Sequence, residues 1–195
     1  MIGKGKSISH GVAALEYDLA KEINGQAVAT EIARHELYGC TGAEMVQEMK
    51  PYHIDFPNVK NNCLRFEVSP SIEESATFTD ADWAELGNDF MQRMGLANHQ
   101  YIIIRHSGTE SKKEQAHLHI LANRVSLSGE LYRDNWIGKK ATEAANAIAK
   151  ERNFVQSQDI GKVNKAEIKE AMDGVLKKMQ GFDFTKFKEE LGKRG

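Results

Sequence analysis

Two histidines, His117 and His119, flank a single leucine in the stretch "QAHLHILANRV". Side chains two positions apart on a β-strand project to the same face, so both imidazoles point the same way while Leu118 and Ile120 point into a core. The β-branched run "QYIIIRH" comes before them and ends in His106. If the two segments pair as an antiparallel hairpin, His106 lies near its loop and adds a third imidazole. Three nitrogen ligands leave coordination positions open, as in a catalytic metal site.

One other interpretation of these histidines stays open, and a second is disfavoured. The "HLH" pattern alone is equally compatible with strand histidines that bind no metal, and only the third histidine favours a metal site. A histidine-triad nucleotide hydrolase would need a further alternating histidine, and this chain has Leu121 there. Asn123 continues the face of His117, where its amide either positions a phosphate or water near the ion or simply ends the strand.

The composition indicates one ordinary globular domain with a small appendage. The chain has 195 residues with 28% charged and 41% hydrophobic residues, and its net charge is -2. Its apolar runs are far shorter than the roughly 20 residues that span a bilayer, and its first residues lack the apolar segment of a secretory signal, so we expect a cytoplasmic protein.

Cys40 and Cys63 lack CxxC spacing and are expected to be reduced thiols. Acidic and basic residues occupy separate stretches, which permits a basic groove despite the net charge.

The periodicity of apolar residues predicts an α+β domain followed by a charged helical tail. Alternation predicts strands in "CLRFEVS" and in the two histidine segments. Helical spacing and a Thr79 to Asp82 capping box predict a helix in "DADWAELGNDFMQRMG", ended by Gly95. Further helices are expected over residues 9–23, 29–39, 42–54 and 138–153, and in the tail over 164–180 and 183–193. We expect the domain to cover residues 1–156 and the helical extension to cover 157–195.

The histidine segments are also similar to a known family. A strand that ends in histidine, then His-hydrophobic-His, three residues and an asparagine ("RHSGTESKKEQAHLHILANRV") resembles the HUH endonucleases, and in particular the Mob-type relaxases, or mobilisation nucleases. The opening "GKGKSISHGVAALEYDLAKE" resembles the family's lysine- and glycine-rich start, which leads into a helix bearing the nucleophilic tyrosine; that match falls on Tyr17. The similarity covers about residues 1 to 155.

This resemblance implies an enzyme that nicks one DNA strand at a transfer origin, for mobilisation of a plasmid or integrative element. Tyr17 would attack the scissile phosphate and keep the 5′ phosphate, releasing a 3′ hydroxyl. His106, His117 and His119 would hold a divalent ion, Mg²⁺ or Mn²⁺. The implied substrate is a single strand with an adjacent duplex or hairpin, and accessory nicking proteins and a coupling ATPase are the implied partners.

Other residues are given roles by their place in these motifs. Glu67, on the polar side of "CLRFEVS", is expected either to assist catalysis by orienting a ligand or accepting the tyrosine proton, or to pair with Arg65. The family often has an aspartate where this chain has Gly108, so support for a histidine is expected from Glu110 or Glu114. Contacts with DNA are expected from the basic and amide residues Lys4, Lys6, Arg65, Arg105, Asn123 and Arg124, and from Lys112 or Lys113.

The resulting hypothesis is a relaxase whose central antiparallel sheet carries helices on one face and a DNA groove on the other. One alternative is another HUH nuclease, a replication initiator or transposase, although a tyrosine that precedes the histidines favours the relaxase order. The second alternative is a non-catalytic accessory protein that binds metal and DNA, which the acidic net charge supports.

Overall fold

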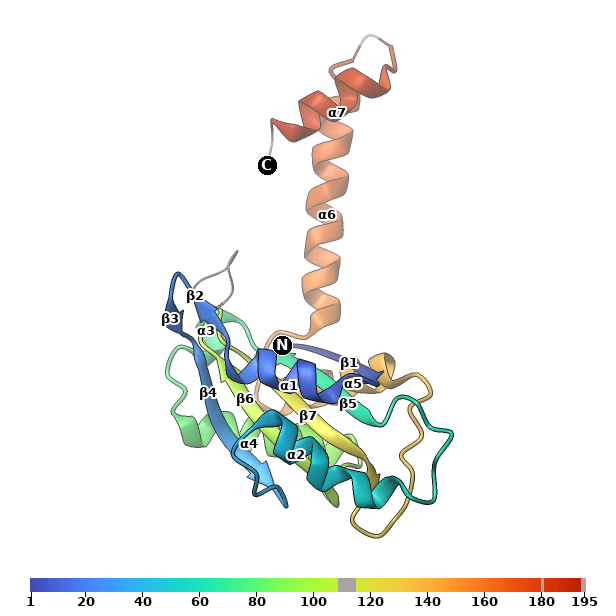
Figure 1. The fold of residues 1–195 in the computed structure, drawn as a ribbon. Coiled ribbons are helices and arrows are strands. Elements are labelled where there is room, and N and C mark those ends of the chain that lie inside the picture. Colours follow the sequence, from blue (N-terminus) through green and yellow to red (C-terminus); the bar gives the residue numbers. More distant parts are fainter. Residues whose placement is uncertain (109–114, 180, 194–195) are drawn as a thin grey trace. The chain divides into compact units, whose positions relative to one another are not determined.

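A computed structural model describes residues 1–108, 115–179 and 181–193, in two compact units that span Met1–Val155 and Gln156–Gly195 (Figure 1). The second unit consists of helices α6 (Ser157–Leu176) and α7 (Phe184–Gly192). None of the helices described is both long and apolar enough to cross a membrane.

The first unit is built on a five-stranded antiparallel sheet with the order β1-β5-β7-β6-β4. These strands are β1 (Ile2–Ile8), β4 (Ala29–His35), β5 (Cys63–Ser69), β6 (His99–His106) and β7 (His117–Ser126). A small separate hairpin pairs β2 (Glu22–Ile23) with β3 (Gln26–Ala27). The histidine-bearing β6 and β7 pair with each other, and β7 is the middle strand. The predicted α+β class and the central antiparallel sheet are therefore confirmed.

Helices cover both faces of this sheet, so the expectation of helices on one face only was wrong (Figure 1). On one face, α4 (Asp80–Arg93) and α5 (Ile137–Glu151) pack on the larger core, which includes Leu118 and Ile120. On the other face, α1 (Gly11–Leu19) and α2 (Gly42–Met49) pack on Leu121 and its neighbours. On this second face the apolar side chains gather toward one end of the strands, because further along the same strands the positions are histidine, arginine, glutamate and lysine.

Several predicted helices are confirmed, one with its predicted cap. The Thr79 hydroxyl accepts from the Asp82 amide and the Asp82 carboxylate accepts in return, so the capping box opens α4. Gly95 follows this helix with a φ of 73°, a backbone conformation that glycine adopts without strain. The helix predicted over residues 42–54 is α2 followed by the 3-10 turn η1 (Lys50–His53), and α3 (Ile72–Ser75) is a single turn.

Two strands differ from the expectation, for different reasons. The helix predicted over residues 29–39 is wrong, because this segment forms the edge strand β4, where a register shift between Glu31 and Ala33 interrupts strict alternation. Strand β1 was not predicted, because glycines occupy the positions that face α5. A Cβ on Gly3 would lie 2.5 Å from the Ala141 carbonyl oxygen, so α5 approaches too closely for any larger residue there.

We expect Gly3→Ala to lower the free energy of unfolding by about 1 to 3 kcal/mol, because its Cβ would force the backbone of α5 away from β1. Urea unfolding would measure this loss. The matched control is Gly138→Ala, whose Cβ would come no closer than 3.5 Å to the Gly5 carbonyl oxygen and should leave the free energy of unfolding unchanged or slightly higher. Equal stabilities for wild type and Gly3→Ala would contradict the close approach.

The two cysteines should differ in reactivity. Cys63 is buried, and burial raises the pKa of its thiol to about 12, whereas Cys40 is exposed. At about pH 8 the Cys63 thiol therefore stays protonated and unreactive, since the thiolate is the nucleophile. We expect iodoacetamide to modify Cys40 alone in the folded protein and both residues in urea, as read by peptide mass spectrometry. Rapid native alkylation of Cys63 would argue against its burial beneath α1.

Candidate metal centre

The β6–β7 pairing brings the three predicted histidines together. His106 lies directly opposite His117 in the strand register, and His119 follows two residues along β7. One nitrogen from each of the three rings lies within 4.8 Å of the others. The Nε2 atoms of His117 and His119 are 3.1 Å apart. Two nitrogens bound to one ion at about 2.1 Å each would be separated by about 3.0 to 3.4 Å, so this pair fits a shared divalent ion.

Backbone carbonyls orient two of the rings. His106 Nε2 donates to the Asp18 carbonyl oxygen at 2.7 Å, and His117 Nδ1 donates to the Gln115 carbonyl oxygen at 3.2 Å. In each ring the second nitrogen then carries a lone pair, which is the form that binds a metal. The cluster is therefore a candidate metal centre with two of its three rings already oriented.

Burial favours the uncharged form of two of these imidazoles, His106 and His119. It is the main cause that lowers the pKa of His106, and it lowers the pKa of His119 to about 2 with help from the neighbouring imidazoles and from Arg65 and Lys4. The three rings lie close together, at centroid distances of 4.5 to 5.3 Å. An ion would therefore meet neutral ligands in His106 and His119.

Asp18, which sequence reasoning missed, links helix α1 to this cluster. Its carboxylate is buried and pairs with Arg65 through two hydrogen bonds, at 2.5 Å to Nη2 and 3.0 Å to Nε. Arg65 Nη2 in turn lies 3.4 Å from His119 Nδ1. The signal in the sequence was an aspartate on the buried side of α1, in line with Gly11, Ala14 and Leu15. Glu110 and Glu114, which we expected to support a histidine, lie outside the described residues.

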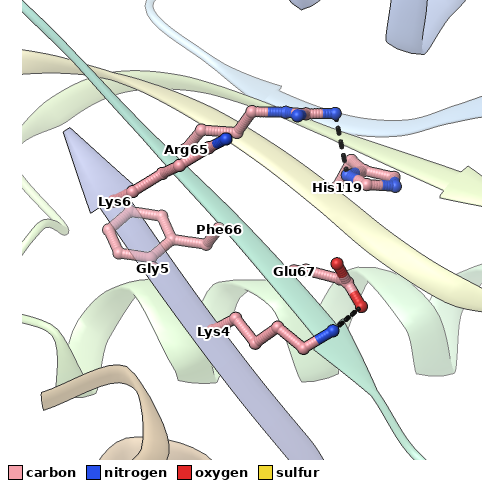
Figure 2. Close-up of a pocket in the computed structure, with 7 residues that line it drawn as sticks. All are labelled: Lys4, Gly5, Lys6, Arg65, Phe66, Glu67 and His119. Carbon is pink, nitrogen blue, oxygen red and sulfur yellow. Dashed lines mark hydrogen bonds and ion pairs between the residues drawn. The ribbon is translucent and has the colours of Figure 1, made fainter. Parts of the chain in front are cut away.

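A pocket on the polar part of the sheet adjoins the cluster (Figure 2). His119, Glu67 and Lys4 stand opposite one another across β7, β5 and β1. Glu67 pairs with Lys4 at 2.9 Å, whereas its predicted partner Arg65 reaches toward His119 (Figure 2). The residues that line the pocket are Lys4, Gly5, Lys6, Arg65, Phe66, Glu67 and His119. Three cations and one carboxylate give it a net positive charge, which suits a phosphate group.

The other predicted DNA contacts take part in internal interactions. Asn123 is fully buried, and its side chain bonds to Met49, Gln100, His53 and the Val125 amide. Because both amide hydrogens and the carbonyl oxygen have these partners, its position does not favour a phosphate contact.

Two predicted arginines are similarly engaged, and two predicted lysines lie outside the structural description. Arg124 donates to the carbonyl oxygens of Tyr132 and Asn61 and pairs with Asp134 at 2.7 Å. Arg105 pairs with Asp80 at 2.5 Å. Lys112 and Lys113 fall within the residues that are not described.

Tyr17 lies on α1 directly before Asp18 and is 57% exposed. Its hydroxyl oxygen accepts a hydrogen bond from Lys21 Nζ at 2.7 Å, and the same ammonium group lies 4.9 Å from the ring centroid. An ammonium group this close stabilises negative charge on the phenolic oxygen. Because the Asp18 carbonyl contacts His106, the helix that displays Tyr17 is joined to the imidazole cluster.

The antiparallel sheet and the cluster of three imidazoles define an α+β domain with a candidate metal centre. Residues 17–154 match the family model described as relaxase, MobA/VirD2-like, nuclease domain. The chain therefore belongs to this family of DNA-nicking proteins, which confirms the resemblance found in the histidine segments. A comparison with curated protein sequences gave no match.

We expect Asp18→Asn to lower the affinity for Mn²⁺ by about 10- to 100-fold. Loss of the carboxylate leaves the charge of Arg65 uncompensated beside His119, where it repels a cation. Calorimetric titration of the full chain with Mn²⁺ would measure the change. Asp89→Asn is the matched control, because it removes a comparable contact with Arg93 at 2.7 Å that involves none of the three histidines. Wild-type affinity in Asp18→Asn would show that the ion pair does not support the centre.

Proposed function

We propose that this chain is a relaxase that cuts one DNA strand at a transfer origin through attack by Tyr17, in the mobilisation of a plasmid or integrative element. The observation that carries this proposal is the hydrogen bond from His106 to the Asp18 carbonyl oxygen, which joins the imidazole cluster to the helix that displays Tyr17. Membership of the relaxase family supports it. The active ion would be Mg²⁺ or Mn²⁺, as the resemblance to mobilisation nucleases suggests.

The reaction is a transesterification. The Tyr17 oxygen forms a bond to phosphorus while the bond from phosphorus to the 3′ oxygen breaks. The tyrosine proton leaves, and the 3′ oxygen takes up a proton to become a hydroxyl group. The 5′ phosphate stays on the protein, which conserves the bond energy for rejoining. Lys21, hydrogen-bonded to the Tyr17 hydroxyl, stabilises the charge that develops there as the proton leaves.

A divalent ion held by His106, His117 and His119 would polarise a phosphate oxygen and offset the charge of the transition state. Arg65, fixed by Asp18 beside His119, is suited to bind the same phosphate group from the protein side. Lys4 and Lys6 extend the positive charge over β1 and would hold neighbouring phosphates. Glu67 stands opposite His119 and pairs with Lys4, which supports a positioning role for this carboxylate within the pocket.

The substrate we propose is a single DNA strand beside a duplex or hairpin. A cytoplasmic location, accessory nicking proteins and a coupling ATPase follow from this role. We also propose that the nuclease domain ends near residue 156, with residues 157–195 as a separate helical extension.

We expect Tyr17→Phe to lower formation of a covalent protein–DNA adduct by a factor of about 10³ or more, because the phenyl ring has no oxygen to attack phosphorus. The assay would use single strands that tile a candidate origin, with Mn²⁺ or EDTA, on a denaturing gel. EDTA should abolish the adduct of the wild-type protein, since the ion would be removed from the three imidazoles.

Tyr38→Phe is the matched control, because Tyr38 is also exposed and its hydroxyl contacts Glu36 instead of a cation. An adduct that survives in Tyr17→Phe would move the nucleophile to another tyrosine. Tight DNA binding by the wild-type protein without any adduct would favour the non-catalytic accessory protein.

A further inference from the structure

Trp136, directly before α5, is exposed to solvent, and its packing does not explain why a tryptophan occupies this position. It is 81% exposed, the highest fraction among the large apolar side chains of the described residues. Its backbone is left-handed, with φ 58° and ψ 28°. That conformation costs roughly 1 kcal/mol for a residue with a Cβ, and glycine or asparagine adopts it more easily. Neither packing nor backbone geometry therefore accounts for a tryptophan here.

The segment that carries Trp136 is firmly held. Arg124 donates to the Tyr132 carbonyl oxygen at 3.2 Å and pairs with Asp134 at 2.7 Å, while the Tyr132 amide donates to the Arg124 carbonyl oxygen at 2.9 Å. The Ile137 amide then donates to the Asp134 carbonyl oxygen at 3.1 Å. The indole is thus presented from a fixed backbone, which reduces the entropy lost when a partner binds to it.

Trp136 lies beside the strand that carries the lysines of the pocket. A Cβ on Gly138, two residues further along, would be 3.5 Å from the Gly5 carbonyl oxygen on β1. Asn61, whose carbonyl oxygen accepts from Arg124, also donates from its side chain to the Ser7 hydroxyl at 3.4 Å. The segment before α5 therefore adjoins the part of β1 that runs from Gly5 to Ser7.

The pocket and α5 lie on opposite faces of the sheet, with the edge strand β1 between them, so a DNA strand that runs from the pocket to Trp136 would pass around this edge. His119, Glu67 and Lys4 form a row across three neighbouring strands, so the cluster and β1 are about 10 Å apart. Arg133 and Lys139 are exposed on either side of Trp136, and the Lys139 Nζ lies 3.8 Å from a Glu143 carboxylate oxygen. A basic surface with an exposed aromatic ring is the combination that binds single-stranded nucleic acid.

We propose that Trp136 is a stacking platform for one base of the single-stranded DNA whose phosphates cross the pocket. The base lies on the indole face, and Lys4 and Lys6 hold phosphates between it and the cluster. This inference rests on the proposed function, since it requires DNA in the pocket. Stacking on an indole accepts any base, so this contact adds affinity and fixes the path of the strand without reading its sequence.

Tryptophan fluorescence tests this inference directly, because the other tryptophan, Trp83, is only 2% exposed. The probe is oligothymidylate of about 16 nucleotides, the upper site size of single-strand modules. It would be added to the full chain with Mg²⁺ at low salt. A stacked base should quench the emission of Trp136, and Trp136→Phe should lose this quenching whereas Trp83→Phe keeps it.

Affinity would be measured independently by anisotropy of the labelled oligonucleotide. Trp136→Ala should weaken binding by about 5- to 150-fold, and Trp136→Phe should retain most of the affinity. Trp136→Gly should weaken binding equally while its Tm stays the same or rises, which excludes misfolding as the cause. Tyr38→Ala is the matched control: this ring is 76% exposed but neighbours Glu36 and Glu48, so its loss should leave binding unchanged.

Equal affinity of wild type and Trp136→Ala, or binding without quenching, would overturn the stacking platform. Failure of the proposed function would look different: oligothymidylate would quench Trp136 as expected, but no origin strand would yield an adduct with Tyr17. Absence of any DNA binding by the wild-type protein would overturn both proposals.

Discussion

The antiparallel register between β6 and β7 is the constraint on which the candidate site depends. It sets His106 opposite His117, and His119 lies two residues further along β7 on the same face of the sheet. A slip of one residue would turn the β7 histidines into the core and bring Leu118 and Ile120 out of it. Because both leucine and isoleucine are buried on the α4–α5 side, the apolar core itself holds the imidazoles in place. The same strand pairing thus fixes both the apolar core and the geometry of the candidate metal centre.

On the second face of the sheet, apolar and polar side chains occupy opposite ends of the same strands. At one end, helices α1 and α2 pack on Leu121, Cys63 and Ile8. Toward the other end, the same strands carry His119, Arg65 and Lys6. Helix α1 spans the transition, because Leu15 packs in the apolar part and Asp18 reaches Arg65. The exposed Tyr17 is therefore fixed relative to the polar part by the packing of its own helix.

The sequence was sufficient where a pattern follows directly from local physics. The histidines were found because alternation on a strand is strict, and α4 because its cap and apolar stripe are both local signals. Strand β1 was missed because the residues that face α5 are glycines. Glycine is needed there because α5 packs so close to β1, and a hydropathy pattern carries no information about the distance between two elements. Asp18 was missed because its partner Arg65 lies 47 residues away, and only the tertiary fold brings the two charges together.

Arg65 holds a positive charge 3.4 Å from His119, one of the imidazoles of the candidate metal centre, and this has a thermodynamic consequence. In the absence of DNA, its charge opposes a divalent ion at the cluster, and Asp18 offsets that opposition only in part. A phosphate anion placed between them attracts both, so the ion and the strand each raise the other's affinity by the same factor. The centre would then hold its ion weakly at rest and tightly only when a phosphodiester is in position, which makes the substrate a component of the metal site.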